Sequence, residues 1–161
     1  MGNSYFSHIE KTPCAFSDLP RPAQKAFIWR AAENGGELSE NIHVNIGSCN
    51  HAPCDVTEEA WGDAISKASV SCEGMFFYFF EVPTESIKSI ILTNNECLSE
   101  DYSCWEDYES DYVDPTLVMH SRTDRFPVLA PLGEEEVLED GWHRLHSYIS
   151  QGHSSVPVLE F

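Results

Sequence analysis

The residue types best suited to chemistry lie near the end of the chain, in the run Asp140-Gly141-Trp142-His143-Arg144. The pattern that follows the run predicts that a helix begins here, and a helix start presents unpaired N–H groups and the positive end of the helix dipole. Gly141 would let a ligand come close to the backbone, while His143 and Arg144 would add side-chain donors. These groups together suit an anion, above all a phosphate.

The elements that would hold this run are a strand before it, a helix and a second strand after it. Trp142, Leu145 and Ile149 fall on one face of a helix, and Gly152 ends the helix before the apolar strand at 156–159. A second interpretation stays open, in which Asp140 only caps the helix and the basic side chains of its first turn are merely exposed.

The run also resembles the D-G-x-H-R box of the ParB and sulfiredoxin superfamily. Upstream, 79–87 resembles the opening strand and turn of that family and 126–130 its middle strand, so the likeness covers roughly 75–161. It implies an α+β fold with a mixed sheet and helices, and a site that binds nucleotide phosphates. The residues that it implicates in binding ATP or CTP with Mg²⁺ are Asp140, Gly141, His143 and Arg144, with His143 and Arg144 as the catalytic pair if the nucleotide is hydrolysed.

Two departures limit what the resemblance implies. Sulfiredoxins have a nucleophilic cysteine directly before the His-Arg pair, whereas this chain has Trp142, so thiolate chemistry is not expected there. Partition proteins of the ParB type continue into a DNA-reading helix-turn-helix, which we do not expect because the sequence ends at Phe161, directly after the last predicted strand. A nucleotide-binding protein with a single ParB-like domain, of a kind found on phages or mobile elements, is the remaining interpretation.

The first part of the chain predicts a small helical or α+β extension, residues 1–74, ahead of the ParB-like part, residues 75–161. One helix is predicted from about residue 23 to Asn34, and another after Thr57, which suits its N-cap. A short strand at 41–46 is expected between the two helices, and a buried strand at 75–82 after them.

The net charge excludes one class of function. Nine Lys and Arg residues stand against 27 Asp and Glu residues, giving a formal charge of −18. Such a surface repels a phosphate backbone, so general DNA binding is not expected, and cationic partners are favoured. No secretory signal and no apolar run of about 20 residues is visible, which predicts a cytoplasmic protein without a membrane segment.

The acids are concentrated in one region, which suggests a second function. Between residues 96 and 140 lie 14 of the 27 acids, and at 96–114 they alternate with aromatic residues. This surface could imitate a nucleic-acid strand and occupy the basic groove of a nucleic-acid-processing protein, as small anti-restriction or anti-CRISPR proteins of phages do. The alternative is an acidic helix or loop whose aromatic side chains pack inward on the core. The partner-binding candidates are Tyr102, Trp105, Glu106, Asp107, Glu109 and Asp111.

Metal sites are less well supported by the sequence. Asp114, Asp124 or Asp140 could hold Mg²⁺ beside a nucleotide. The run 49–54 contains two cysteines and a histidine, but with Cys97 and Cys104 its spacing does not favour zinc. The six cysteines are expected to be reduced and partly buried.

Overall fold

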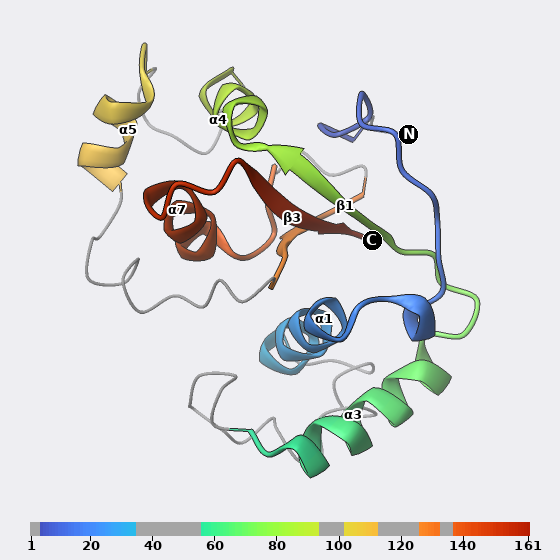
Figure 1. Cartoon of the computed structure of the whole chain (residues 1–161). Helices are drawn as coiled ribbons and strands as arrows, with labels where there is room; N and C mark the ends of the chain where they lie inside the picture. Colours follow the sequence, from blue (N-terminus) through green and yellow to red (C-terminus); the bar gives the residue numbers. More distant parts are fainter. Residues whose placement is uncertain (1–3, 35–55, 94–101, 113–125, 133–136) are drawn as a thin grey trace. The chain divides into compact units, whose positions relative to one another are not determined.

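The computed structural model describes residues 4–34, 56–93, 102–112, 126–132 and 137–161 (Figure 1). These residues form helices and a small mixed sheet, which confirms the expected α+β class. Contacts divide the chain into two compact units. We call Pro13–Phe77 the helical unit, and Met1–Thr12 together with Tyr78–Phe161 the sheet unit.

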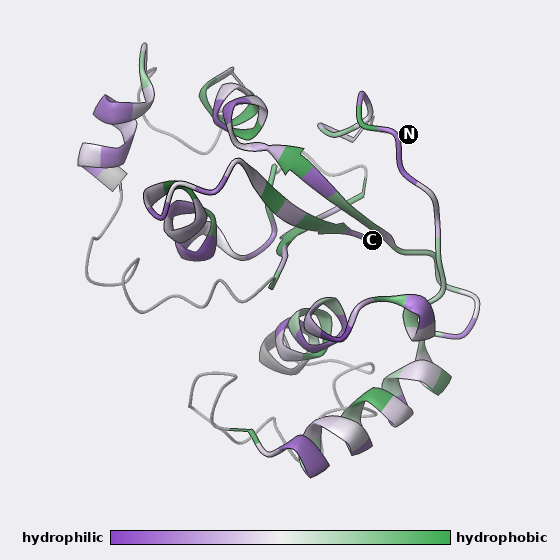
Figure 2. Cartoon of the chain, viewed as in Figure 1, coloured by the Kyte–Doolittle hydropathy of each residue, from purple (hydrophilic) through white to green (hydrophobic). Residues whose placement is uncertain are grey.

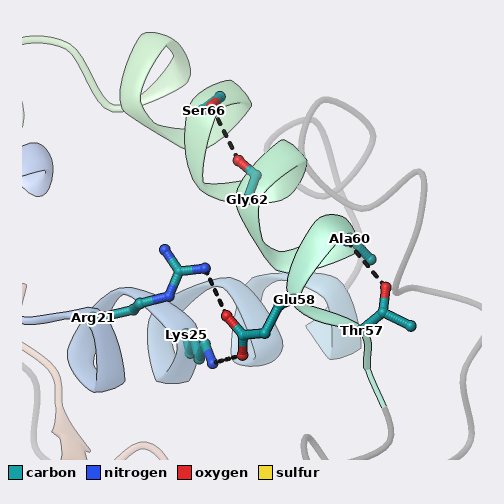
Figure 3. A network of polar contacts seen from close by, with 7 residues as sticks. All are labelled: Arg21, Lys25, Thr57, Glu58, Ala60, Gly62 and Ser66. Carbon is teal, nitrogen blue, oxygen red and sulfur yellow. Dashed lines mark hydrogen bonds and ion pairs between the residues drawn. The ribbon is translucent and has the colours of Figure 1, made fainter.

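The helical unit contains the short 3-10 helix η1 (Phe16–Asp18) and the helices α1 (Arg21–Asn34) and α3 (Glu58–Ser71). The N-cap of α3 is Thr57, as predicted, and its hydroxyl accepts a hydrogen bond from the Ala60 N–H at 3.2 Å. Figure 3 shows Glu58 between Lys25 at 2.8 Å and Arg21 at 3.0 Å, and these hydrogen bonds lower the pKa of Glu58. The first turn of α3 is thus bound to α1.

Aromatic rings fill the inside of the helical unit. Phe16, Phe27 and Phe77 pack with centroids 5.1–5.8 Å apart, and each is almost fully buried. Trp61 packs against Trp29 at 6.4 Å. The strand expected at 41–46 lies outside the described residues.

The sheet unit is built on β1 (Tyr78–Pro83), β2 (Val128–Ala130) and β3 (Ser155–Glu160), in the order β1-β3-β2. β1 pairs with β3 antiparallel, and β2 pairs with β3 in parallel. Pro157 lies in β3 but pairs in register only with β1, because β2 begins opposite Val158. The missing N–H of the proline therefore costs no bond to β2.

The strand expected at 75–82 begins later than predicted. Met75 and Phe76 lie outside β1 and are 39% and 68% exposed, so only the second half of this apolar run forms the strand. Directly after β1 the chain enters helix α4 (Thr84–Thr93), where the sequence suggested a turn. The Thr84 hydroxyl donates to the His153 carbonyl at 2.6 Å, which joins the start of α4 to the segment before β3.

Two further helices complete the described part of the sheet unit, α5 (Trp105–Tyr112) and α7 (Trp142–Ser150). α7 connects the parallel strands β2 and β3 and contacts both. The green bands of β1 and β3 in Figure 2 mark the apolar side chains of these strands. The core of the unit consists of Phe6, Phe80, Val82, Ile87, Ile91, Trp105, Tyr108, Val128, Ala130, Val137, Leu138, Leu145, Tyr148, Val156 and Val158.

The described start of the chain, from residue 4, packs with the sheet unit through a buried acid. Glu160, at the end of β3, is 1% exposed and forms an ion pair with Lys11 and a hydrogen bond with Ser4. The Lys11 ammonium also lies 4.7 Å from the ring centroid of Phe80. Residues 1–12 were expected to belong to the N-terminal extension, because an ion pair between positions 149 apart leaves no local pattern in the sequence.

Candidate functional site

The predicted helix start lies where the sequence placed it. α7 begins at Trp142 after Gly141, which is the N-cap and has a φ of 94°. The N-cap residue Gly141 has no side chain that could cap the helix, and the first turn contains no acid. Asp140 instead joins Leu129 in a β-bridge, so the interpretation of Asp140 as a side-chain cap is wrong. The positive end of the helix dipole is therefore not neutralised by a carboxylate in the first turn.

The structure gives Gly141 a structural role. A Cβ at this position would lie 3.1 Å from the Val128 Cα, closer than ordinary packing allows. A φ of 94° is also a conformation that residues with a side chain rarely adopt. Gly141 is buried, and its backbone approaches β2. Its presence in the box is thus explained without a ligand.

The two basic residues of the box differ in their surroundings. Arg144 is half-buried, and its Nη1 donates to the Pro127 carbonyl at 2.6 Å, while its guanidinium carbon lies 5.7 Å from the Phe126 ring centroid. Tyr148, one turn further on, donates to the Phe126 carbonyl at 2.8 Å. α7 thereby fixes the two residues that precede β2. His143 is exposed at the start of the same helix.

A further histidine of α7, which the sequence analysis did not select, joins α7 to α5. His146 is 3% exposed, and its Nε2 lies 3.1 Å from the Tyr108 hydroxyl. Its ring packs against the rings of Trp105 at 5.3 Å and Tyr108 at 5.4 Å. Burial lowers the pKa of His146 to about 4, with a smaller contribution from the nearby His143, so the imidazole is neutral at pH 7. The histidines three residues apart were a signal, because such spacing places them on neighbouring parts of one helix face.

The acidic stretch separates into two faces when it folds as α5. Trp105 and Tyr108 are 6% and 4% exposed, whereas Glu106, Asp107 and Asp111 are exposed. Figure 2 shows α5 mostly in the hydrophilic colours. Trp105, which the sequence suggested as a partner contact, is largely buried, and its ring packs against Tyr108 with the centroids 4.8 Å apart, so little of the ring is accessible to a partner.

The other partner candidates keep varying degrees of access. Tyr102 is half-buried and donates to the Asp111 carboxylate at 2.9 Å, which occupies part of that acid's hydrogen-bonding capacity. Glu109 is half-buried. Glu106 and Asp107, in the first turn of α5, are exposed, although both carboxylates also interact with Cys104.

The described residues contain no group of His, Cys, Asp or Glu side chains that could hold a metal ion. Cys14, Cys72 and Cys104 are free, and burial raises the pKa of the Cys72 thiol to about 11. The other candidate ligands, Asp114, Asp124, Cys49, His51, Cys54 and Cys97, lie outside the described residues. Within the described part of the chain, no helix has the length and apolar character needed to cross a bilayer.

Comparisons with known proteins identified no relative of this chain. No model of a protein family matches the chain, and no curated protein and no solved structure is significantly similar to it. The function of the chain must therefore be inferred from the geometry of the site.

Proposed function

We propose that the chain binds the phosphate groups of a nucleotide at the first turn of α7. The observation that carries the proposal is that the N-cap of α7 is Gly141, which has no capping side chain, and that His143 and Arg144 lie in the first turn of the helix. The N–H groups of a helix start bind anions well, and the helix dipole adds to the attraction. The likeness of 140–144 to the D-G-x-H-R box supports the same ligand class.

The two basic residues would act differently on the phosphates. The bond from Arg144 to the Pro127 carbonyl fixes the direction of the guanidinium, so this group would serve as a positioned charge. His143 is exposed and would donate to a phosphate oxygen or transfer a proton. A nucleotide would arrive with Mg²⁺, because the ion reduces the repulsion between phosphates and a chain of charge −18.

Thermal unfolding with millimolar ATP or CTP and Mg²⁺ tests this function. Bound nucleotide should raise the Tm by mass action, and Arg144→Ala should remove the increment. Arg21→Ala is the matched control, since it removes an ion-paired guanidinium from the helical unit. If no nucleoside triphosphate changes the Tm of the wild-type protein, the nucleotide proposal fails.

The role of His143 has its own test. His143→Ala should lower any hydrolysis rate more than it weakens binding, because a proton-transferring group acts on the chemical step. Equal losses would make His143 a phosphate contact only.

A second candidate function is favoured by the two faces of α5. A helix that buries its aromatic residues and presents Glu106 and Asp107 offers an acidic surface on a fixed support. Such a surface suits a basic protein groove, as a non-enzymatic inhibitor or adaptor would use it. Binding of this kind should weaken steeply as salt rises and should compete with DNA or RNA for the partner.

A further inference from the structure

A cavity of about 520 Å³ lies between α4 and the start of α5, away from the residues of the D-G-x-H-R box. This volume is in the range of ligand-binding cavities. Its walls combine two carboxylates, one ammonium group, several hydroxyls and two aromatic rings. Glu85, Lys88 and Ser89 of α4 line one side, and Ser103, Trp105 and Glu106 line the other.

One cation already occupies a favourable position in this cavity. The Lys88 ammonium lies 5.8 Å from the ring centroid of Trp105 and 3.4 Å from a carboxylate oxygen of Glu85. A cation within about 6 Å of an indole is attracted by the ring. The side chain of Lys88 is 22% exposed, so it lies largely within the protein surface. Lys88 therefore shows where a positive charge is stabilised.

The charge of the walls leaves room for a second cation. Glu85 and Glu106 come from opposite walls, and Lys88 neutralises one of them at most. Hydroxyl oxygens of Ser89 and Ser103 supply acceptors for N–H groups. Guanidinium is planar and carries five donors, so it can donate to carboxylates on both walls and to hydroxyl oxygens at once, which an ammonium group with three donors does less well.

We infer that this cavity receives an arginine side chain of a basic partner protein, and that Lys88 competes with this arginine for the carboxylates of the cavity. The inference rests on the second candidate function, in which α5 meets a basic groove. Glu106 belongs both to the cavity and to the exposed acidic face of α5, so an arginine seated here would bring further basic residues of the partner beside Asp107. A protein-borne arginine is favoured over a free amine because only the former uses both surfaces.

The test measures the affinity of a labelled twelve-residue peptide of alternating Arg and Ser by fluorescence anisotropy. Glu85→Gln should weaken binding roughly tenfold, and Lys88→Met should tighten it roughly threefold by removing the competitor. The ion pair of Asp63 and Lys67 in the helical unit supplies matched controls, because Asp63→Asn and Lys67→Met make the same changes of charge elsewhere. Both controls should change the affinity less than twofold.

Three outcomes would overturn the inference, and they are distinguishable. If Glu85→Gln and Lys88→Met have no effect while Asp107→Asn weakens binding, the acidic face of α5 is used without the cavity. If the affinity of every variant, the controls included, depends only on net charge, both the acidic-surface function of α5 and the role of the cavity are wrong. If acetyl-arginine amide binds as tightly as the peptide, the site binds a small guanidinium compound and not a protein.

Discussion

The first turn of α7 and the helix α5 differ in how their polar residues relate to the fold. At α7, Gly141 packs on β2 and Arg144 is bonded to the carbonyl of Pro127, so the residues selected for chemistry also hold the structure. At α5, the buried aromatic residues hold the helix and the acids face outward. Substitutions of the polar residues at the start of α7 should therefore change both stability and ligand binding. Substitutions of the outer acids of α5 should change partner binding with little effect on stability.

The largest effect is expected at Gly141. Gly141→Ala should lower the free energy of unfolding by about 3 kcal/mol, because it adds the cost of a positive φ to the crowding of Val128. Urea unfolding of the purified variant measures this change.

Two other glycines separate the contributions to this loss. Gly152→Ala should cost only about 1 kcal/mol, since its φ is +76° but the space around it is open. Gly62→Ala, inside α3 and also in open space, should stabilise by about 0.5–1 kcal/mol. If Gly141→Ala were as mild as Gly152→Ala, the close approach to β2 would not matter, and the glycine would be available for a ligand.

Part of the fold and of the candidate site could be predicted from the sequence. Capping and periodicity predicted the start of α3 and the extent of α7 closely, because Thr57 and Gly152 are strong local signals. The second interpretation of the acidic stretch, with aromatic side chains packed inward, agrees with the burial of Trp105 and Tyr108.

The features that could not be predicted depend on contacts between positions far apart in the sequence, which local patterns do not reveal. The bond between Tyr108 and His146 joins residues 38 positions apart, and the cavity is lined by two separate segments. The reason for Gly141 was also hidden, since the sequence cannot show that Val128 lies against it. The function class stays a prediction.

The next effect concerns the junction of the two regions, at His146. Its pKa is about 4 in the folded protein and near 6.5 when unfolded, so the unfolded state takes up the proton first as the pH falls. Stability from this group is complete above about pH 6.5 and is lost as the pH falls towards 4, by up to about 3 kcal/mol. Urea unfolding between pH 7 and pH 4 measures the loss.

A pair of variants isolates the contribution of His146 from that of the titrating acids. His146→Gln should show a weaker loss of stability towards pH 4, whereas His8→Gln, at an exposed position, should behave as the wild-type protein does. Identical pH profiles for all three proteins would mean that α5 and α7 are not joined by a neutral histidine.

A smaller effect is expected within the box itself. Arg144→Met should cost about 1.5 kcal/mol through the lost charge-assisted bond to Pro127, while the exposed His143→Gln should stay within about 0.5 kcal/mol. Thermal unfolding without ligand measures both. If both substitutions change the stability negligibly, Arg144 has no structural role, and a role in ligand contact is favoured.

The smallest effect is expected on the outer face of α5. In the triple variant Glu106→Gln, Asp107→Asn, Glu109→Gln, the first two substitutions remove favourable interactions with the helix dipole in the first turn. All three relieve repulsion in a chain of charge −18. These contributions are similar and opposite, so the free energy of unfolding should change by less than about 0.5 kcal/mol.

On the inner face, Tyr108→Phe should cost about 1 kcal/mol, because it removes the hydroxyl beside His146. A triple variant that unfolds more readily than Tyr108→Phe would show that the acids hold the helix, and α5 would then resemble α7 in joining structure to its polar residues.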